Sequence, residues 1–291
     1  MKKTIFAVMM SFSLFTMASD DVVKDASNKD KESDFSQYVF KIIESTQAAL
    51  DEAYDGIESQ MAETVKTSSK KLLAKPIIFK ALINSAKIRF EADIEEADDE
   101  DAIKDNKPYY ASMAMAGLQT QLRQVTGAMT KNEMIARARI ISDVAKYYNR
   151  KDPSMCRYLP QDFSVLLNIE SEWVAEVDEE RLENAIEAEI KAIERVYKGV
   201  DSVIVADVDT QALFSKFASE WFSGISEQEK ERISVSRNSG NYCVLWSIIL
   251  NDAAKMSEVY PSASRKILLP LMTMPTRGWL DVDKWGFKPI Q

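Results

Sequence analysis

The sequence predicts an all-α protein, a multi-helix, bundle-like array with orthogonal packing and roughly eight or nine helices in two packed halves. Glycine and proline are scarce, with 8 of each in 291 residues, whereas β-rich folds use more turns. Apolar residues recur at steps of three and four, and capping sequences separate these periodic segments. The only convincing strand-like run, residues 202–206 (SVIVA), cannot form a sheet alone and is interpreted as an extended connector.

The two halves are expected to pack around residues 241–274, the most apolar stretch after residue 20. It contains the runs 243–250 (CVLWSIIL) and 267–272 (ILLPLM). A helix that is apolar on all sides is typically buried in the core. These runs are far shorter than the ~18 residues that a membrane span requires, so we expect a central buried helix.

The first residues have the layout of a bacterial-type secretory signal peptide. Two lysines precede an uncharged apolar segment, residues 4–17, and small side chains follow at Thr16 and Ala18. We expect residues 1–18 to be removed by cleavage as a signal peptide, and an uncleaved anchor helix is the alternative. The first cysteine is Cys156, so lipoprotein anchoring is not expected. The mature chain is predicted to be periplasmic or secreted, without a membrane span.

The charge balance favours a basic protein partner. The chain has 37 basic and 46 acidic side chains, and loss of two lysines with the signal peptide leaves a net charge of −11. Such a protein is repelled by nucleic-acid phosphates and anionic lipid surfaces, so nucleic-acid binding is not expected. The oligomeric state stays open.

The chain order suggests where its parts begin and end. Residues 19–33 are polar and charged, as in disordered leaders. A polar connection at residues 149–160 is the best candidate for a boundary between two halves. The predicted parts are the signal peptide 1–18, the disordered leader 19–33, the N-terminal half 34–150, the C-terminal half 151–275 and an aromatic tail 276–291.

Helix boundaries in the N-terminal half follow from periodicity and caps. Apolar steps from Phe35 to Val65 continue without a break and predict one long helix that stops before Pro76. Thr130 and Glu133 form a capping box. The expected helices cover residues 34–75, 76–90, 106–127 and 130–148.

The C-terminal half carries similar signals. Pro160 suits a helix start and is followed by apolar residues as far as Val177, whereas Gly199 ends the next helix. Ser226 and Glu229 form a second capping box. Further helices are expected at residues 160–177, 179–198, 209–224, 226–238, 241–259 and 262–274.

The two cysteines, Cys156 and Cys243, predict a disulfide because the chain is exported. The bond would join the connection between the halves to the start of the central helix. Two buried thiols are the alternative. Their separation in sequence excludes a Cys-x-x-Cys redox pair.

Several classes of catalysis are excluded by composition. The chain has no histidine, which removes Ser-His-Asp and Cys-His nucleophilic sites and every histidine-based zinc motif. Neither a G-x-x-x-x-G-K-[ST] loop nor a G-x-G-x-x-G turn occurs. No cofactor and no metal are expected.

Carboxylate chemistry remains as an alternative, since two carboxylates suffice to cleave a glycosidic bond. The candidates are Glu170 and Glu172 near Trp173, and Glu220 next to Trp221. An apolar wall can raise the pKa of a carboxyl group. With 46 acidic residues in the chain, however, some adjoin a tryptophan by chance, and solvated helix faces are the simpler interpretation.

The tail provides the candidate partner-binding residues Trp279, Trp285 and Phe287. These large apolar side chains occur in a segment without helical periodicity. We expect them to fold back into a groove of the body. The alternative is a docking surface for another protein, because aromatic residues are enriched at interface hot spots.

The leading functional interpretation is a secreted or periplasmic helical protein-binding factor, such as an inhibitor, an immunity-type partner, a chaperone or an assembly accessory. It follows largely by exclusion of catalytic and cofactor motifs. The alternatives are a carboxylate-based cell-wall glycosidase and an exported factor that acts on a host. The identity of the partner stays open.

Overall fold

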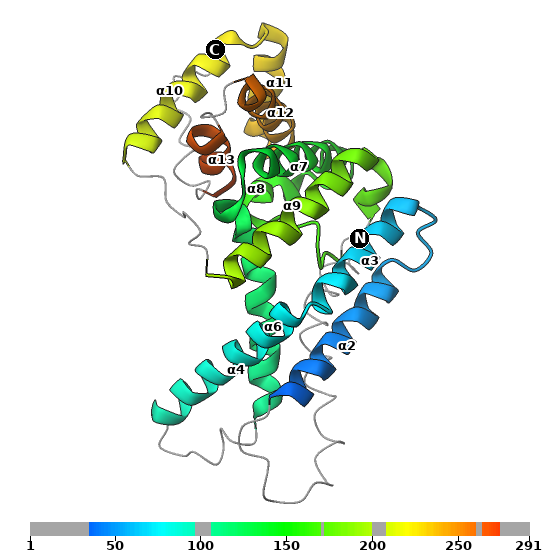
Figure 1. The fold of residues 1–291 in the computed structure, drawn as a ribbon. Helices are drawn as coiled ribbons and strands as arrows, with labels where there is room; N and C mark the ends of the chain where they lie inside the picture. The colour runs from blue at the N-terminus through cyan, green and yellow to red at the C-terminus, as the bar shows by residue number, and fades with distance from the viewer. Residues whose placement is uncertain (1–34, 97–105, 170–171, 200–207, 260–263, 274–291) are drawn as a thin grey trace, which may run out of the picture. The chain divides into compact units, whose positions relative to one another are not determined.

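The computed structural model describes residues 35–96, 106–169, 172–199, 208–259 and 264–273 (Figure 1). Regular secondary structure in these ranges is helical and includes no strand, which confirms the all-α prediction. The described ranges contain eleven α-helices, slightly more than the eight or nine expected. The strand-like run 202–206 lies outside the described residues.

The chain divides into two compact units, Met1–Ile42 with Leu82–Met115, and Ile43–Ala81 with Ala116–Gln291. Three helices contribute residues to both units: α2 (Ser36–Ala53), α4 (Pro76–Glu96) and α6 (Lys107–Gln124). The predicted boundaries of the two halves, 34–150 and 151–275, stay a prediction.

The first unit has an aromatic core. The ring centroid of Phe90 lies 5.3 Å from that of Phe35 and 5.4 Å from that of Tyr110, both in edge-to-face geometry. Such aromatic pairs add stabilisation beyond the apolar area that they bury. The Lys107 ammonium lies 5.6 Å from the Phe90 centroid, and the Tyr110 hydroxyl donates to Asp93 at 2.8 Å.

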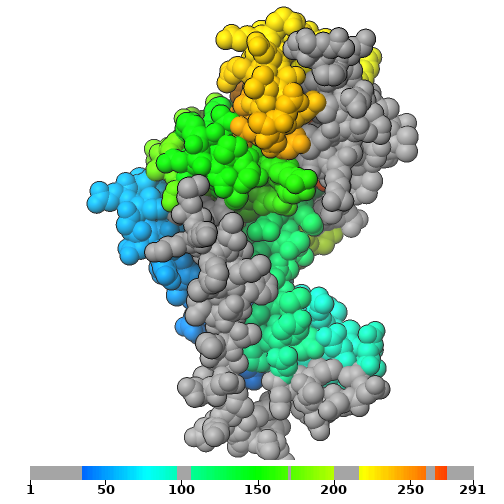
Figure 2. Space-filling view, turned by 180° about the vertical axis from the view of Figure 1, so that it is seen from behind, coloured from blue at the N-terminus to red at the C-terminus, as the bar shows by residue number. Residues whose placement is uncertain are grey.

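The second unit is built around α7 (Lys131–Lys151), which packs against α12 (Cys243–Val259) on one side and α9 (Glu179–Tyr197) on the other (Figure 1). In Figure 2 the orange surface of α12 borders the green surface of α7. Helix α12 is mostly buried, as the apolar run predicts; its buried residues are Cys243, Val244, Leu245, Trp246, Ile249, Leu250, Ala253, Ala254 and Ser257.

Both predicted capping boxes are present. The Thr130 N–H donates to the Glu133 carboxylate at 2.8 Å at the start of α7. At the start of α11 (Glu227–Asn238), the Ser226 N–H donates to Glu229 at 3.1 Å and the Glu229 N–H donates back to the Ser226 hydroxyl at 3.3 Å. These bonds satisfy N–H groups that the first helical turn leaves without partners.

The prediction of one long helix before Pro76 is wrong. Helix α2 ends at Ala53, and α3 (Gln60–Leu73) begins after a turn. Gly56 adopts φ +75° in this turn, a conformation that glycine accepts readily and that ends an α-helix. The apolar spacing continues across the turn, so periodicity alone does not reveal it.

The predicted helix over residues 160–177 is also wrong. Among the described residues of this range, only α8 (Leu159–Asp162) and the 3-10 segment η3 (Glu172–Glu176) are helical, and residues 163–169 form a loop after α8. Leu167 has φ 58° in this loop. Buried side chains from other elements hold the loop, as described below, and they override its local preference.

The remaining helices include α10 (Val208–Gly224) and α13 (Leu269–Thr273), with the 3-10 segments η1 (Val125–Ala128) and η2 (Pro153–Arg157) and the π-helical turn η4 (Ser264–Leu268). Helix α13 packs against η4, η1 and α8. Among the described helices, none is long and apolar enough to cross a membrane.

Candidate functional site

A fully buried ion pair joins α7 to α9. The Arg137 guanidinium Nη1 lies 2.5 Å from the Glu189 carboxylate Oε1. The two side chains are 0% and 1% exposed, so solvent does not reach either group. Each side chain extends from the apolar face of its helix into the contact between the helices. A buried charge is tolerated only when it is paired and hydrogen-bonded.

The Glu189 carboxylate also holds the loop at residues 163–169. It accepts hydrogen bonds from the Ser164 hydroxyl at 2.7 Å, the Val165 N–H at 3.0 Å and the Leu166 N–H at 3.1 Å. Arg137 donates its Nη2 to the carbonyl oxygen of Phe163. The ion pair therefore fixes both the side chains and the backbone of the loop.

Two further contacts complete this anchor, which we call the loop anchor (Arg137, Glu189 and the loop residues that they hold). The Leu167 N–H donates to the Ser69 hydroxyl of α3 at 3.1 Å. The Tyr54 hydroxyl donates to the carbonyl oxygen of Asn168 at 3.1 Å. These bonds explain how Leu167 is held at positive φ, which costs free energy for a non-glycine residue.

The electrostatics of the loop anchor are those of a structural site. Burial raises the pKa of Glu189, whereas Arg137, Ser164 and the two backbone N–H groups oppose that rise. Burial lowers the pKa of Arg137. Each hydrogen-bond partner of the Glu189 carboxyl is a donor, an arrangement that favours the ionised carboxylate. With both side chains excluded from solvent, the pair exposes no surface to a ligand, and its contacts hold elements of the fold together.

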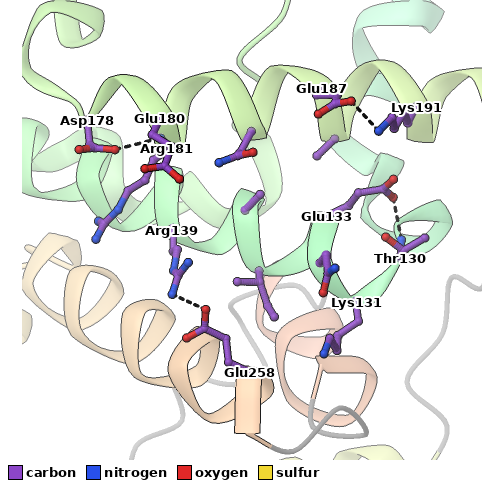
Figure 3. Close-up of a pocket in the computed structure, with 15 residues that line it drawn as sticks. Thr130, Lys131, Glu133, Arg139, Asp178, Glu180, Arg181, Glu187, Lys191 and Glu258 are labelled. Atoms are coloured by element: carbon purple, nitrogen blue, oxygen red, sulfur yellow. Dashed lines mark hydrogen bonds and ion pairs between the residues drawn. The ribbon is translucent and has the colours of Figure 1, made fainter.

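An open polar groove lies on the surface between α7 and α9, and it reaches the end of α12 (Figure 3). We call it the α7–α9 groove; its volume is ≈ 790 Å³. Small and mid-sized residues, Asn132, Ala136, Asn184 and Ala188, line it together with longer charged side chains. The charged lining residues are Lys131, Glu133, Arg139, Asp178, Glu180, Arg181, Glu187, Lys191 and Glu258.

Many of these charged side chains form ion pairs. Arg139 reaches from α7 to Glu258 at 2.6 Å, and Lys191 pairs with Glu187 along α9 at 2.6 Å (Figure 3). Arg181 pairs with Asp143 at 2.8 Å. Sites for small molecules are usually concave and mostly apolar, so an open groove with charged walls suits a segment of a protein better.

The outward face of α9 adds unpaired negative charge beside this groove. Glu179, Glu180 and Glu183 are exposed, and none of them forms an ion pair with another described residue. We call these three residues the acidic face of α9.

The candidate carboxylates from the sequence are not in apolar surroundings where the structure describes them. Glu172 is exposed and accepts a hydrogen bond from the Tyr147 hydroxyl at 3.0 Å, although the neighbouring Trp173 is buried. Glu220 is exposed and lies 3.8 Å from Lys216. Glu170 lies outside the described residues. Both Glu172 and Glu220 are thus solvent-exposed side chains with a polar or charged neighbour.

The structure joins Cys156 and Cys243 in a disulfide, with their Cα atoms 5.1 Å apart. This is the pairing that the sequence predicts. Trp246 donates its indole N–H to the Cys156 carbonyl oxygen at 2.7 Å, so the bond lies in a packed part of the core. The tail residues Trp279, Trp285 and Phe287 lie outside the described residues.

Within the described ranges, no group of three or more His, Cys, Asp or Glu side chains is arranged to hold a metal ion. Sequence reasoning missed both the loop anchor and the groove. The available signal for the anchor was a charged residue at an apolar position, because Glu189 falls in the row Leu182, Ala185, Ile186, Glu189, Ala192 and Ile193.

Comparison of the chain with protein-family models, with curated proteins and with solved structures finds no match.

Proposed function

We propose that this chain is an exported helical protein-binding factor that takes a basic segment of another protein along α9. The observation that supports the proposal is the acidic face of α9 beside the α7–α9 groove. Glu179, Glu180 and Glu183 are exposed and form no ion pair within the described residues. They are therefore available to cations of a partner.

Charge gives such a surface a kinetic advantage. The net charge of −11 expected for the mature chain attracts a basic protein over the Debye length, about 8 Å at physiological ionic strength. Complementary charge raises the association rate more than it lowers the dissociation rate. Binding is therefore expected to weaken as salt rises.

The compartment is part of the same proposal. The N-terminal signal sequence directs the chain to the periplasm or the medium. The Cys156–Cys243 pair is consistent with that destination, because disulfides persist in oxidising compartments.

Affinity capture with the purified mature protein, from periplasm and from medium, tests the proposal. The variant Glu179→Lys/Glu180→Lys/Glu183→Lys is expected to lose a stoichiometric partner. A matched control reverses three exposed charges on α4, with the substitutions Glu91→Lys, Glu95→Lys and Glu96→Lys. The control has the same net charge as the α9 variant and is expected to retain the partner.

A peptidoglycan-release assay run beside the capture addresses the glycosidase alternative. We expect no release of muropeptides by the wild-type protein. Release that disappears in Glu172→Gln would overturn the binding-factor proposal and assign catalysis to that carboxylate.

A further inference from the structure

The α7–α9 groove is lined along both helices by small and mid-sized side chains at helical spacing. Asn132 and Ala136 lie four residues apart on α7, and Asn184 and Ala188 lie four residues apart on α9. Residues four apart share one face of a helix, so each helix presents such a row to the groove. The side-chain ridges of a further helix pack into rows of this kind.

The groove is also straight, because the two helices run antiparallel. Arg195, near the end of α9, pairs with Glu133, near the start of α7. Along α9 the groove extends from Asp178 to Lys191 (Figure 3). At 1.5 Å per helical residue this is about 20 Å, the length of a helix of about 14 residues.

The charges inside the groove do not select the charge of an occupant. Cations and anions lie side by side along it, and most pair with each other, as Arg139 does with Glu258 and Lys191 with Glu187. Attraction for a basic segment comes instead from the acidic face of α9. Its Glu180 also lines the groove, so the acidic face and the groove are continuous.

The backbone of an occupant favours a helix over an extended segment. An extended segment binds best by adding to a sheet edge, and the described residues contain no strand. In the groove its backbone N–H and C=O groups would therefore depend on side chains and water. A helix pairs these groups internally, and only its side chains have to match the walls.

We propose that the basic partner segment binds the α7–α9 groove as an amphipathic α-helix of about 14 residues. The face toward Ala136 and Ala188 carries small side chains. Lysine or arginine side chains one turn apart meet Glu179, Glu180 and Glu183. This inference rests on the proposed function and adds the conformation and the chemical class of the partner segment.

Two synthetic probes of alanine and lysine, each about 14 residues long to match the groove, test the inference by fluorescence anisotropy with the isolated mature protein. The first probe is held as a helix by a side-chain staple and carries its lysines on one face. The second has the same lysines and the same two stapling residues unjoined, and two central prolines prevent the helix. We expect the helical probe to bind at least tenfold more tightly than the proline probe.

Variants that fill the groove without changing its charge provide the structural test. Ala136→Tyr is expected to weaken binding of the helical probe at least tenfold. Asn184→Tyr, at an exposed position, is a second such variant in case Ala136→Tyr disturbs the packing of α7. Ala92→Tyr places the same side chain at an exposed position of α4 and is expected to leave the affinity unchanged.

The outcomes separate this inference from the proposed function. Equal affinity for the two probes, no binding of the helical probe, or binding that persists at the wild-type level in both groove variants would overturn the helical mode. If both probes bind equally and both lose affinity in the variant Glu179→Lys/Glu180→Lys/Glu183→Lys, the acidic face still takes a basic segment and only the helical mode fails. If neither probe loses affinity in that variant, the proposed function fails as well.

Discussion

Substitution of Glu189 by glutamine is expected to destabilise the protein strongly, because it removes the charge that holds the loop anchor together. The wild-type carboxylate accepts from Arg137, Ser164, Val165 and Leu166. Glutamine keeps one acceptor oxygen and turns an amide group toward the remaining donors. Arg137 is then left as an unpaired charge with an exposed fraction of 0%.

Removing one partner of a buried ion pair costs about 3–5 kcal/mol, which is a large share of the ~5–15 kcal/mol that stabilises a typical domain. Urea unfolding followed by circular dichroism measures this loss as a lower midpoint. Glu187→Gln is the matched control. It breaks the ion pair with Lys191, whose partners are 53% and 64% exposed, and exposed pairs contribute about 0–1 kcal/mol.

The double variant Arg137→Met/Glu189→Leu completes a thermodynamic cycle with the single variants Arg137→Met and Glu189→Leu. Its loss is expected to be smaller than the sum of the two single losses, since it leaves neither charge unpaired. A loss below about 1 kcal/mol for Glu189→Gln, or single losses that add up to that of the double variant, would refute this description of the loop anchor.

Three other predictions concern stability. Denatured mature protein is expected to show no free thiol, and two free thiols in oxidised material would disprove the pairing. The Cys156–Cys243 bond closes a loop of 87 residues, so its reduction is expected to lower the unfolding free energy by about 4–5 kcal/mol. Burial and the bond to Asp93 raise the pKa of Tyr110 from its ordinary value of 10.0 to about 12. The stabilising effect of Tyr110 is therefore complete below pH 10.0 and disappears as the pH rises to about 12. Unfolding titrations of Tyr110→Phe should show a shallower fall in stability over that range, and an unchanged slope would contradict the assignment. Gly240→Ala is expected to lower the free energy of unfolding by about 1–2 kcal/mol, because Gly240 has φ +78°. Gly117 lies in a helix with open space at the added Cβ, so Gly117→Ala is expected to raise the free energy of unfolding by about 0.5–1 kcal/mol. Equal shifts in Tm for the two variants would argue against both predictions.

Much of the fold follows from local sequence signals. The two capping boxes at Thr130 and Ser226 place helix starts correctly, because the bonds that they form involve residues three positions apart. The apolar run after Cys243 indicates the buried helix α12 in the same way. Such signals need no knowledge of the rest of the molecule.

The loop at residues 163–169 and the α7–α9 groove could not be predicted from the sequence, because both depend on contacts between residues that are distant in the chain. The loop at residues 163–169 is held by Ser69, Arg137 and Glu189, which are distant in sequence. In the chain, Arg137 and Glu189 resemble the many charged residues of solvated helix faces. They differ from those residues only in position, because each lies on the helix face that is otherwise apolar. The groove likewise forms only when α7 and α9 pack together.

The measurement that tests the central proposal most directly is the association rate of the captured partner with the wild-type protein and with the two charge-reversed variants. We expect the association rate of the wild-type protein to fall as salt rises. At a given salt concentration, the variant Glu179→Lys/Glu180→Lys/Glu183→Lys is expected to associate at least tenfold more slowly than the wild type. The α4 control is expected to differ from the wild type by less than twofold, because only the α9 variant alters the proposed contact surface. Equal rates for the two variants would show that net charge alone, and not the acidic face of α9, determines the encounter, and would contradict the proposal.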